Sequence, residues 1–105
     1  LTQDIVNYIQ ENYADLNLSR TTVADHFRIS VYSLSRVFKN QLDTGFAEYL
    51  IHCRLTHVID LLEHSEQSVA EISDACGFAS ASYLSKLFKS VYGMTPGQYR
   101  QQRNR

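Results

Sequence analysis

Two segments of the chain, SLSRVFKNQLD at residues 33–43 and YLSKLFKSVYG at residues 83–93, repeat cationic and hydroxyl side chains at matching positions. The matched pairs are Leu34 with Leu84, Ser35 with Ser85, Phe38 with Phe88, Lys39 with Lys89, and the cations Arg36 with Lys86. Guanidinium, ammonium and hydroxyl groups donate hydrogen bonds, and the cations attract anions, so the repeat offers the chemistry of binding a negatively charged partner. The repetition also indicates a duplicated unit.

A helical wheel at about 100° per residue divides both segments into an apolar side and a polar side. The side expected to face the core carries Leu34, Val37, Phe38 and Gln41 in the first segment, and Leu84, Leu87, Phe88 and Val91 in the second. The opposite side carries Tyr32, Arg36, Lys39 and Asn40, and then Ser82, Lys86, Lys89 and Ser90. Neither outward side contains an acid.

Outward sides of this composition match the edges of bases in a major groove, where Arg can pair bidentately with guanine. We predict base contacts from Arg36 and Lys86, with four neutral side chains beside them: Tyr32, Ser35, Ser82 and Ser85. Cations further along each helix suit phosphates, which fix register without reading sequence. The predicted phosphate contacts are Lys39, Asn40, Lys89 and Ser90. A solvated helix face is the competing interpretation, and the duplication favours a binding surface over it.

The elements that must position these side chains all read as helices. Apolar spacing and capping residues predict seven helices. The first two begin at the N-caps Thr2 and Ser19, the third runs from Ser30 to about Leu42, and the fourth from Gly45 to about Glu63. The fifth runs from Ser68, with Glu71 in its capping box, to Gly77, the sixth from Ser80 to Tyr92, and the seventh begins at Thr95-Pro96. No stretch alternates like a strand. We therefore predict an all-α domain.

The repeat has the form of a short helix, a tight turn and a longer helix, which is a helix-turn-helix. The predicted organisation is a first helix-turn-helix subdomain at 1–44, a linker helix at 45–63 and a second helix-turn-helix subdomain at 64–105. A linker of this length would span about 28 Å.

Charge is segregated along the chain although the formal net charge is only −1. From Cys76 onward there are five cations (Lys86, Lys89, Arg100, Arg103 and Arg105) and no acid, whereas residues 1–75 carry five cations and eleven acids. No apolar run approaches the roughly 20 residues of a membrane span, and no signal sequence precedes the first helix. Two cysteines are too few for a disulfide framework, so we expect reduced thiols and a cytoplasmic location.

The second half resembles the signature of AraC/XylS-family transcription regulators. The resemblance rests on Ser68-Val69-Ala70-Glu71-Ile72, Cys76-Gly77-Phe78, Ser82-Tyr83-Leu84-Ser85-Lys86-Leu87-Phe88-Lys89, Gly93-Met94-Thr95-Pro96 and Gln98-Tyr99-Arg100, with Tyr49-Leu50 and Arg54 before them. It implies a bacterial DNA-binding domain of seven helices, whose two recognition helices enter successive major grooves about 34 Å apart. It also implies base contacts at Val31, Tyr32, Ser35 and Arg36 and at Ala81, Ser82, Ser85 and Lys86. Two positions depart from the family pattern: Asp43 stands where the repeat matches Gly93, and Val58 replaces a usually small residue.

Two other functions, an enzyme and a protein-interaction module, compete with DNA binding. An enzyme is not expected, because no phosphate-binding loop or hydrolase motif occurs, and Cys53 with His57 supplies only two of the ligands that a metal site needs; no cofactor is predicted. A helical protein-interaction module, whose cations meet an acidic partner, is the alternative that remains. The expected partners are double-stranded DNA, RNA polymerase, and a sensing or dimerisation domain elsewhere in the full-length protein. The sequence is compatible both with base reading by the second unit and with contacts mainly to the DNA backbone.

Overall fold

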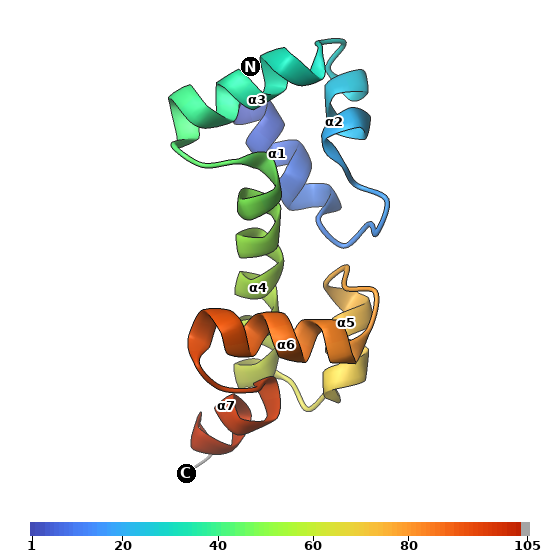
Figure 1. The fold of residues 1–105 in the computed structure, drawn as a ribbon. Helices are drawn as coiled ribbons and strands as arrows, with labels where there is room; N and C mark the ends of the chain where they lie inside the picture. The colour runs from blue at the N-terminus through green and yellow to red at the C-terminus, as the bar shows by residue number, and fades with distance from the viewer. Residues whose placement is uncertain (104–105) are drawn as a thin grey trace. The chain divides into compact units, whose positions relative to one another are not determined.

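The structure, a computed structural model, describes residues 1–103. Within that range the chain forms seven α-helices, one π-helical stretch and no β-strand, which confirms the predicted all-α class (Figure 1). The elements are α1 (Thr2–Asn12), α2 (Arg20–His26), α3 (Val31–Val37), η1 (Phe38–Leu42), α4 (Phe46–His64), α5 (Val69–Ala75), α6 (Ala81–Tyr92) and α7 (Pro96–Arg103). Arg105, one of the cations counted above, lies outside the described residues.

The chain divides into two compact units, one of residues 1–53 and one that starts at Arg54. The boundary falls inside α4, so this helix contributes its first part to one unit and its second part to the other. Each unit contains a short helix, a turn and a second helix, namely α2 with α3 in the first and α5 with α6 in the second (Figure 1). In the first unit α3 has the same length as α2, and η1 extends it.

The core of the first unit fixes which side of α3 faces inward. Ile5 and Ile9 of α1, Leu34 of α3 and Phe38 of η1 are all 0% exposed. The Phe38 ring meets Phe46 of α4 edge-on, with 5.4 Å between ring centroids, an arrangement that aromatic pairs favour. Because burying side chains of this size contributes roughly 1.5–3 kcal/mol each, turning α3 about its axis would be costly.

The second unit buries α6 in the same way. Leu84 and Phe88 are 0% exposed, and the Phe88 ring lies 5.8 Å from that of Tyr99 on α7. Ile72 of α5 is also fully buried. Val58 of α4, the departure from the family pattern noted above, is 0% exposed, so the unit accommodates the larger side chain within its core.

Serine hydroxyls begin four helices, as predicted. The side chains of Ser19, Ser30, Ser68 and Ser80 each accept a hydrogen bond from the backbone N–H three residues on, at 3.0–3.2 Å. Each bond satisfies one of the N–H groups that a helix leaves without an intrahelical partner. The prediction for Thr2 is wrong: α1 already includes Thr2, its N-cap is Leu1, and no side chain caps it.

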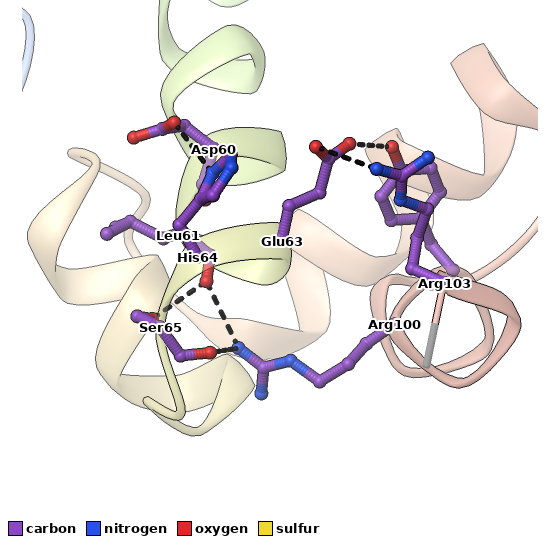
Figure 2. Close-up of polar contacts among 8 residues, drawn as sticks. Asp60, Leu61, Glu63, His64, Ser65, Arg100 and Arg103 are labelled. Carbon is purple, nitrogen blue, oxygen red and sulfur yellow. Dashed lines mark hydrogen bonds and ion pairs between the residues drawn. The ribbon is translucent and has the colours of Figure 1, made fainter. Parts of the chain in front are cut away.

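Arg100 of α7 caps the C-terminal end of α4 (Figure 2). Its guanidinium donates hydrogen bonds to the backbone carbonyls of Leu61 (3.3 Å) and Ser65 (3.1 Å), which Figure 2 draws. It also donates to the carbonyls of Leu62 (3.2 Å) and Gln67. Carbonyls in the last turn of a helix lack intrahelical donors, and the negative end of the helix dipole attracts a cation. Arg100 therefore joins the end of α4, the following loop and α7.

Glu63 of α4 makes a second connection to α7 (Figure 2). Its carboxylate accepts a hydrogen bond from the Tyr99 hydroxyl and pairs with Arg103 at 3.4 Å. Donation to this carboxylate raises the pKa of Tyr99 above its ordinary value. Arg100 and Arg103 are thus engaged inside the second unit, so the basic excess of the C-terminal segment overstates the charge that it offers to a partner.

Candidate nucleic-acid interface

The two repeated segments have the same pattern of exposure, residue for residue, from 32–44 to 82–94. Leu34 and Phe38, like Leu84 and Phe88, are fully buried. The residues directly after each phenylalanine are exposed on both segments. The duplication that the sequence suggests is therefore present in how α3, η1 and α6 are packed.

The structure leaves every predicted contact residue at least partly accessible. Among the predicted base contacts, Val31, Tyr32, Arg36, Ser82 and Lys86 are exposed, while Ser35, Ala81 and Ser85 are half-buried. The predicted phosphate contacts Lys39, Asn40, Lys89 and Ser90 are all exposed. Tyr32 is 68% exposed, which confirms that its ring is outside the core.

In the first unit all the predicted contacts except Val31 line one surface hollow. Its lining consists of Tyr32, Ser35, Arg36, Lys39 and Asn40, which are all predicted base or phosphate contacts. These side chains present hydroxyl, amide, guanidinium and ammonium groups, and no carboxylate lies among them. Such a surface can donate many hydrogen bonds and repels no anion.

Tyr32 and Arg36 interact directly, one helical turn apart. The Arg36 Nη1 donates a hydrogen bond to the Tyr32 Oη at 3.1 Å, and the Arg36 Cζ lies 5.7 Å from the centroid of the Tyr32 ring. Residues four apart are neighbours on a helix surface, so the spacing permits this contact. The sequence places both residues on one face, but it does not reveal the hydrogen bond.

The corresponding face of the second unit has weaker groups for recognition. Ser82 and Lys86 occupy the positions of Tyr32 and Arg36. Within the part of the chain that the structure describes, neither Lys86 nor Lys89 has an ion-pair partner. A lysine ammonium is a flexible point charge and cannot form the planar, two-point contact of a guanidinium.

The first helix of each helix-turn-helix, α2 or α5, ends in a turn with the same hydrogen bond. In the first unit the Ile29 N–H donates to the Ala24 carbonyl at 3.0 Å, and in the second the Phe78 N–H donates to the Ser73 carbonyl at 3.0 Å. Both turns need one residue with positive φ, as expected of this type of helix ending. Gly77 adopts it at φ 85°, but in the first unit Arg28 does so at φ 57°.

The third predicted helix is not α-helical throughout. It was expected to run to about Leu42, but the α-helix ends at Val37 and continues as the π-helical η1. At its end the Asp43 N–H donates to the Phe38 carbonyl five residues back, whereas the Gly93 N–H of the second unit donates to Lys89, four residues back. No residue in η1 signals this wider turn in the sequence.

Asp43 keeps the backbone conformation of the glycine that it replaces. Its φ of 53° lies in the left-handed region, as does the φ of 80° at Gly93. A side chain added at Gly93 would meet no atom within 4 Å, so the positive φ rather than a lack of space favours glycine at this position. Aspartate tolerates the left-handed region better than most residues do, which explains how the turn is preserved.

Two residues placed on the core side by the helical wheel are in fact exposed. Gln41 is exposed, and Val91 is 53% exposed. The last inward positions are instead occupied by Leu42 and Tyr92, both half-buried. The Tyr92 ring lies 4.6 Å from that of Phe88 and closes the edge of the core.

One cation near this surface is not among the contact residues predicted from the sequence. Arg20, the first residue of α2, lines a second hollow together with Ser35 and Lys39. The carboxylates of Asp43 and Glu48 line the same hollow, so its charges are balanced. Arg20 reaches Ser35 and Lys39 through the packing of α2 against α3, and the sequence holds no signal for that packing.

Other kinds of site have little support. Among the described residues, no three His, Cys, Asp or Glu side chains lie close enough to hold a metal ion. Burial raises the pKa of the Cys76 thiol to about 11, so its reactive thiolate is scarce near neutral pH. None of the described helices is long and apolar enough to cross a membrane.

Comparisons with known proteins agree with this geometry. A family profile described as a helix-turn-helix domain matches residues 23–102. The uncharacterised HTH-type transcriptional regulator YijO of Escherichia coli K12 is 40% identical over 102 residues, which cover 97% of this chain and 36% of that protein. The chain thus spans about a third of the length of the curated relatives that it matches.

Three solved structures of regulator domains share this fold. The C-terminal domain of AraT, a response regulator from Geobacillus stearothermophilus, has a TM-score of 0.93 at 30% identity and covers 97% of this chain and 84% of that one. The DNA-binding domain of the global transcriptional factor AdpA, solved with a target DNA, has a TM-score of 0.90 at 27% identity, covering 96% and 90%. A regulator from Chromobacterium violaceum with an AraC-type DNA-binding domain has a TM-score of 0.84 at 29% identity, covering 96% and 89%.

Proposed function

The chain belongs to the AraC/XylS family of helix-turn-helix domains, and on this premise we propose that it binds double-stranded DNA sequence-specifically as part of a transcription regulator. The observation that carries the proposal is the pair of equally packed helices whose outward sides bear cations at matching positions. The AdpA domain, similar in sequence and fold, was solved with DNA, which supports the same partner for this chain.

In the proposed complex α3 and α6 enter successive major grooves, each with its exposed side against the base edges. Arg36 and Lys86 contact bases, with six neighbours around them: Val31, Tyr32, Ser35, Ala81, Ser82 and Ser85. The cations Lys39 and Lys89, with Asn40 and Ser90, contact phosphates. Arginine discriminates bases better than lysine because its two parallel N–H groups match guanine O6 and N7. The first unit therefore supplies more of the sequence preference, and the second supplies more of the backbone contact.

The wider role follows the same premise. The subdomains at 1–44 and 64–105, with the linker helix at 45–63, form one binding module without catalytic activity. In the full-length protein this module acts with a sensing or dimerisation domain, contacts RNA polymerase and works in the cytoplasm. The relatives' greater length supports the presence of a further domain, because the chain covers only about a third of them.

The proposal is tested by selecting binding sites from random duplexes and measuring affinity for the selected site. Arg36→Ala should weaken binding to that site by roughly 1–3 kcal/mol and relax the preference at one base pair. Arg103→Ala is the control, since it removes the same charge from α7, where Arg103 pairs with Glu63. It should leave the preference at every base pair unchanged.

The alternative, a protein-interaction module, predicts a different result. Its cations would bind an acidic protein surface, and no duplex sequence would be enriched over random DNA. Recovery of no preferred sequence, with equal binding by the parent chain and Arg36→Ala, would refute the proposed function.

A further inference from the structure

Tyr32 has two possible roles on the exposed face of α3, and the structure distinguishes them. A tyrosine in this position could contact a base itself, or it could act through a neighbour. Its hydroxyl already accepts a hydrogen bond from the Arg36 Nη1 at 3.1 Å, before any partner is bound. Both side chains are exposed, so no packing forces them together.

The hydrogen bond is the main component of this contact. The Arg36 Cζ lies 5.7 Å from the ring centroid of Tyr32, close to the outer limit of about 6 Å for an attraction between a cation and an aromatic face. The guanidinium therefore lies toward the hydroxyl edge of the ring. Phenylalanine at position 32 would keep the ring and lose the main contact.

The bond leaves the reading edge of Arg36 available. A guanidinium has five N–H donors, and only one from Nη1 is directed to Tyr32. The Nε and Nη2 donors form a parallel pair that matches guanine O6 and N7. The Tyr32 hydroxyl keeps its own hydrogen, which can be donated to a nearby acceptor.

We propose that Tyr32 is a positioning residue that holds the Arg36 guanidinium in place so that its Nε and Nη2 edge selects guanine. This inference rests on the proposed function and assigns the recognised base within it. Immobilising a long side chain is a main cost of binding, and a side chain already restrained loses less freedom. The restraint should improve discrimination for guanine by about two- to tenfold.

The second unit shows what is missing when the restraint is absent. Ser82 and Lys86 occupy the equivalent positions, and a serine side chain is too short to span one turn to the tip of a lysine. The inference thus applies to the first unit alone. It predicts that removing an exposed tyrosine hydroxyl from α6 has no such effect.

A double-mutant cycle tests the inference on the 105-residue chain. Affinity is measured for the selected site and for the same site with the Arg36-contacted guanine replaced, using the parent, Tyr32→Phe, Arg36→Ala and the double variant. Tyr32→Phe should lower the discrimination two- to tenfold in the parent and have no effect once Arg36 is alanine. Tyr83→Phe is the control, since Tyr83 is half exposed on α6, and it should change nothing.

Three results would overturn the inference. An equal effect of Tyr32→Phe in both backgrounds would show that Tyr32 contacts the DNA itself. An unchanged discrimination in the parent background would show that the restraint is irrelevant to recognition. A parent chain that selects no duplex would refute the proposed function and remove this inference with it.

A measurement without DNA separates the restraint from its use. Nitrogen-15 relaxation of the Arg36 Nε reports the motion of the guanidinium on the nanosecond timescale. Its order parameter should fall in Tyr32→Phe and stay constant in Tyr83→Phe. Equal order parameters in the parent chain and Tyr32→Phe would show that the hydrogen bond does not hold the side chain, and would overturn the inference whatever the affinities.

Discussion

Replacing Arg100 with methionine should destabilise the second unit substantially. Methionine keeps an unbranched, apolar stem of similar reach and removes the guanidinium. The substitution would not affect the four acceptor carbonyls equally. The Leu61 carbonyl would keep hydrogen bonds from the N–H and the hydroxyl of Ser65. The carbonyls of Leu62, Ser65 and Gln67 would lose the guanidinium as their donor.

The magnitude follows from these three bonds. A hydrogen bond to a charged group contributes about 1.5–3 kcal/mol, but the values do not add, and the half-buried site lets water replace part of each bond. We expect a loss of about 2–4 kcal/mol in the free energy of unfolding. Arg103→Met provides the matched control on the same helix, because Arg103 is 58% exposed and its ion pair with Glu63 is worth about 0.2–1 kcal/mol.

Urea denaturation followed by circular dichroism measures both variants. Arg100→Met should move the unfolding midpoint clearly further than Arg103→Met does. Equal shifts, or a loss below about 1 kcal/mol for Arg100→Met, would refute the conclusion that the guanidinium caps α4 and would leave it as another solvated cation.

Three more predictions follow from the turns, the caps and the exposed cations. Lys39→Ala and Lys89→Ala should each weaken binding to all duplexes alike and lower the salt dependence of affinity by about one ion, measured by titration with salt. Arg28→Gly should stabilise the chain by up to about 1 kcal/mol, because the strain of a left-handed arginine exceeds the entropy cost of the more flexible glycine. Asp43→Gly should stabilise it less, because aspartate tolerates this conformation better. A larger gain in unfolding temperature for Asp43→Gly than for Arg28→Gly would contradict the argument. Hydrogen bonds from the backbone and side chain of Ser68 lower the pKa of Glu71. The ionised Glu71 carboxylate therefore contributes fully to stability above pH 4.5, and this contribution declines as the pH falls through the lowered pKa. Denaturation of Glu71→Gln across this pH range should show its deficit shrinking toward acid.

The sequence predicted the elements well because their signals are local. Serines at helix starts, Pro96 at the first position of α7 and the spacing of Leu84 and Phe88 act within one or two turns, and each was found where expected. The outward direction of Tyr32 follows from the same periodicity.

Features that depend on distant contacts were not predictable in the same way. Arg100 counts as one more basic residue in the sequence, and its carbonyl partners lie 33–39 positions earlier in the chain. A helical wheel assumes a regular helix of constant burial, so it predicted neither the π-helical turn of η1 nor the exposure of Val91. The contact between Tyr32 and Arg36 combines both kinds of information. The spacing of the two residues in the sequence permits it, but the hydrogen bond is known only from the structure.

The identical exposure pattern of residues 32–44 and 82–94 has a consequence for how this protein could change over time. Because the buried residues and the serine caps determine how α3 and α6 are packed, the other outward positions can vary with little effect on folding. A gene duplication would then yield two copies that diverge in target preference while each retains its scaffold. If the proposed function holds, placing the tyrosine and arginine of one copy at the serine and lysine positions of the other would give a domain whose two units carry the same contact pair.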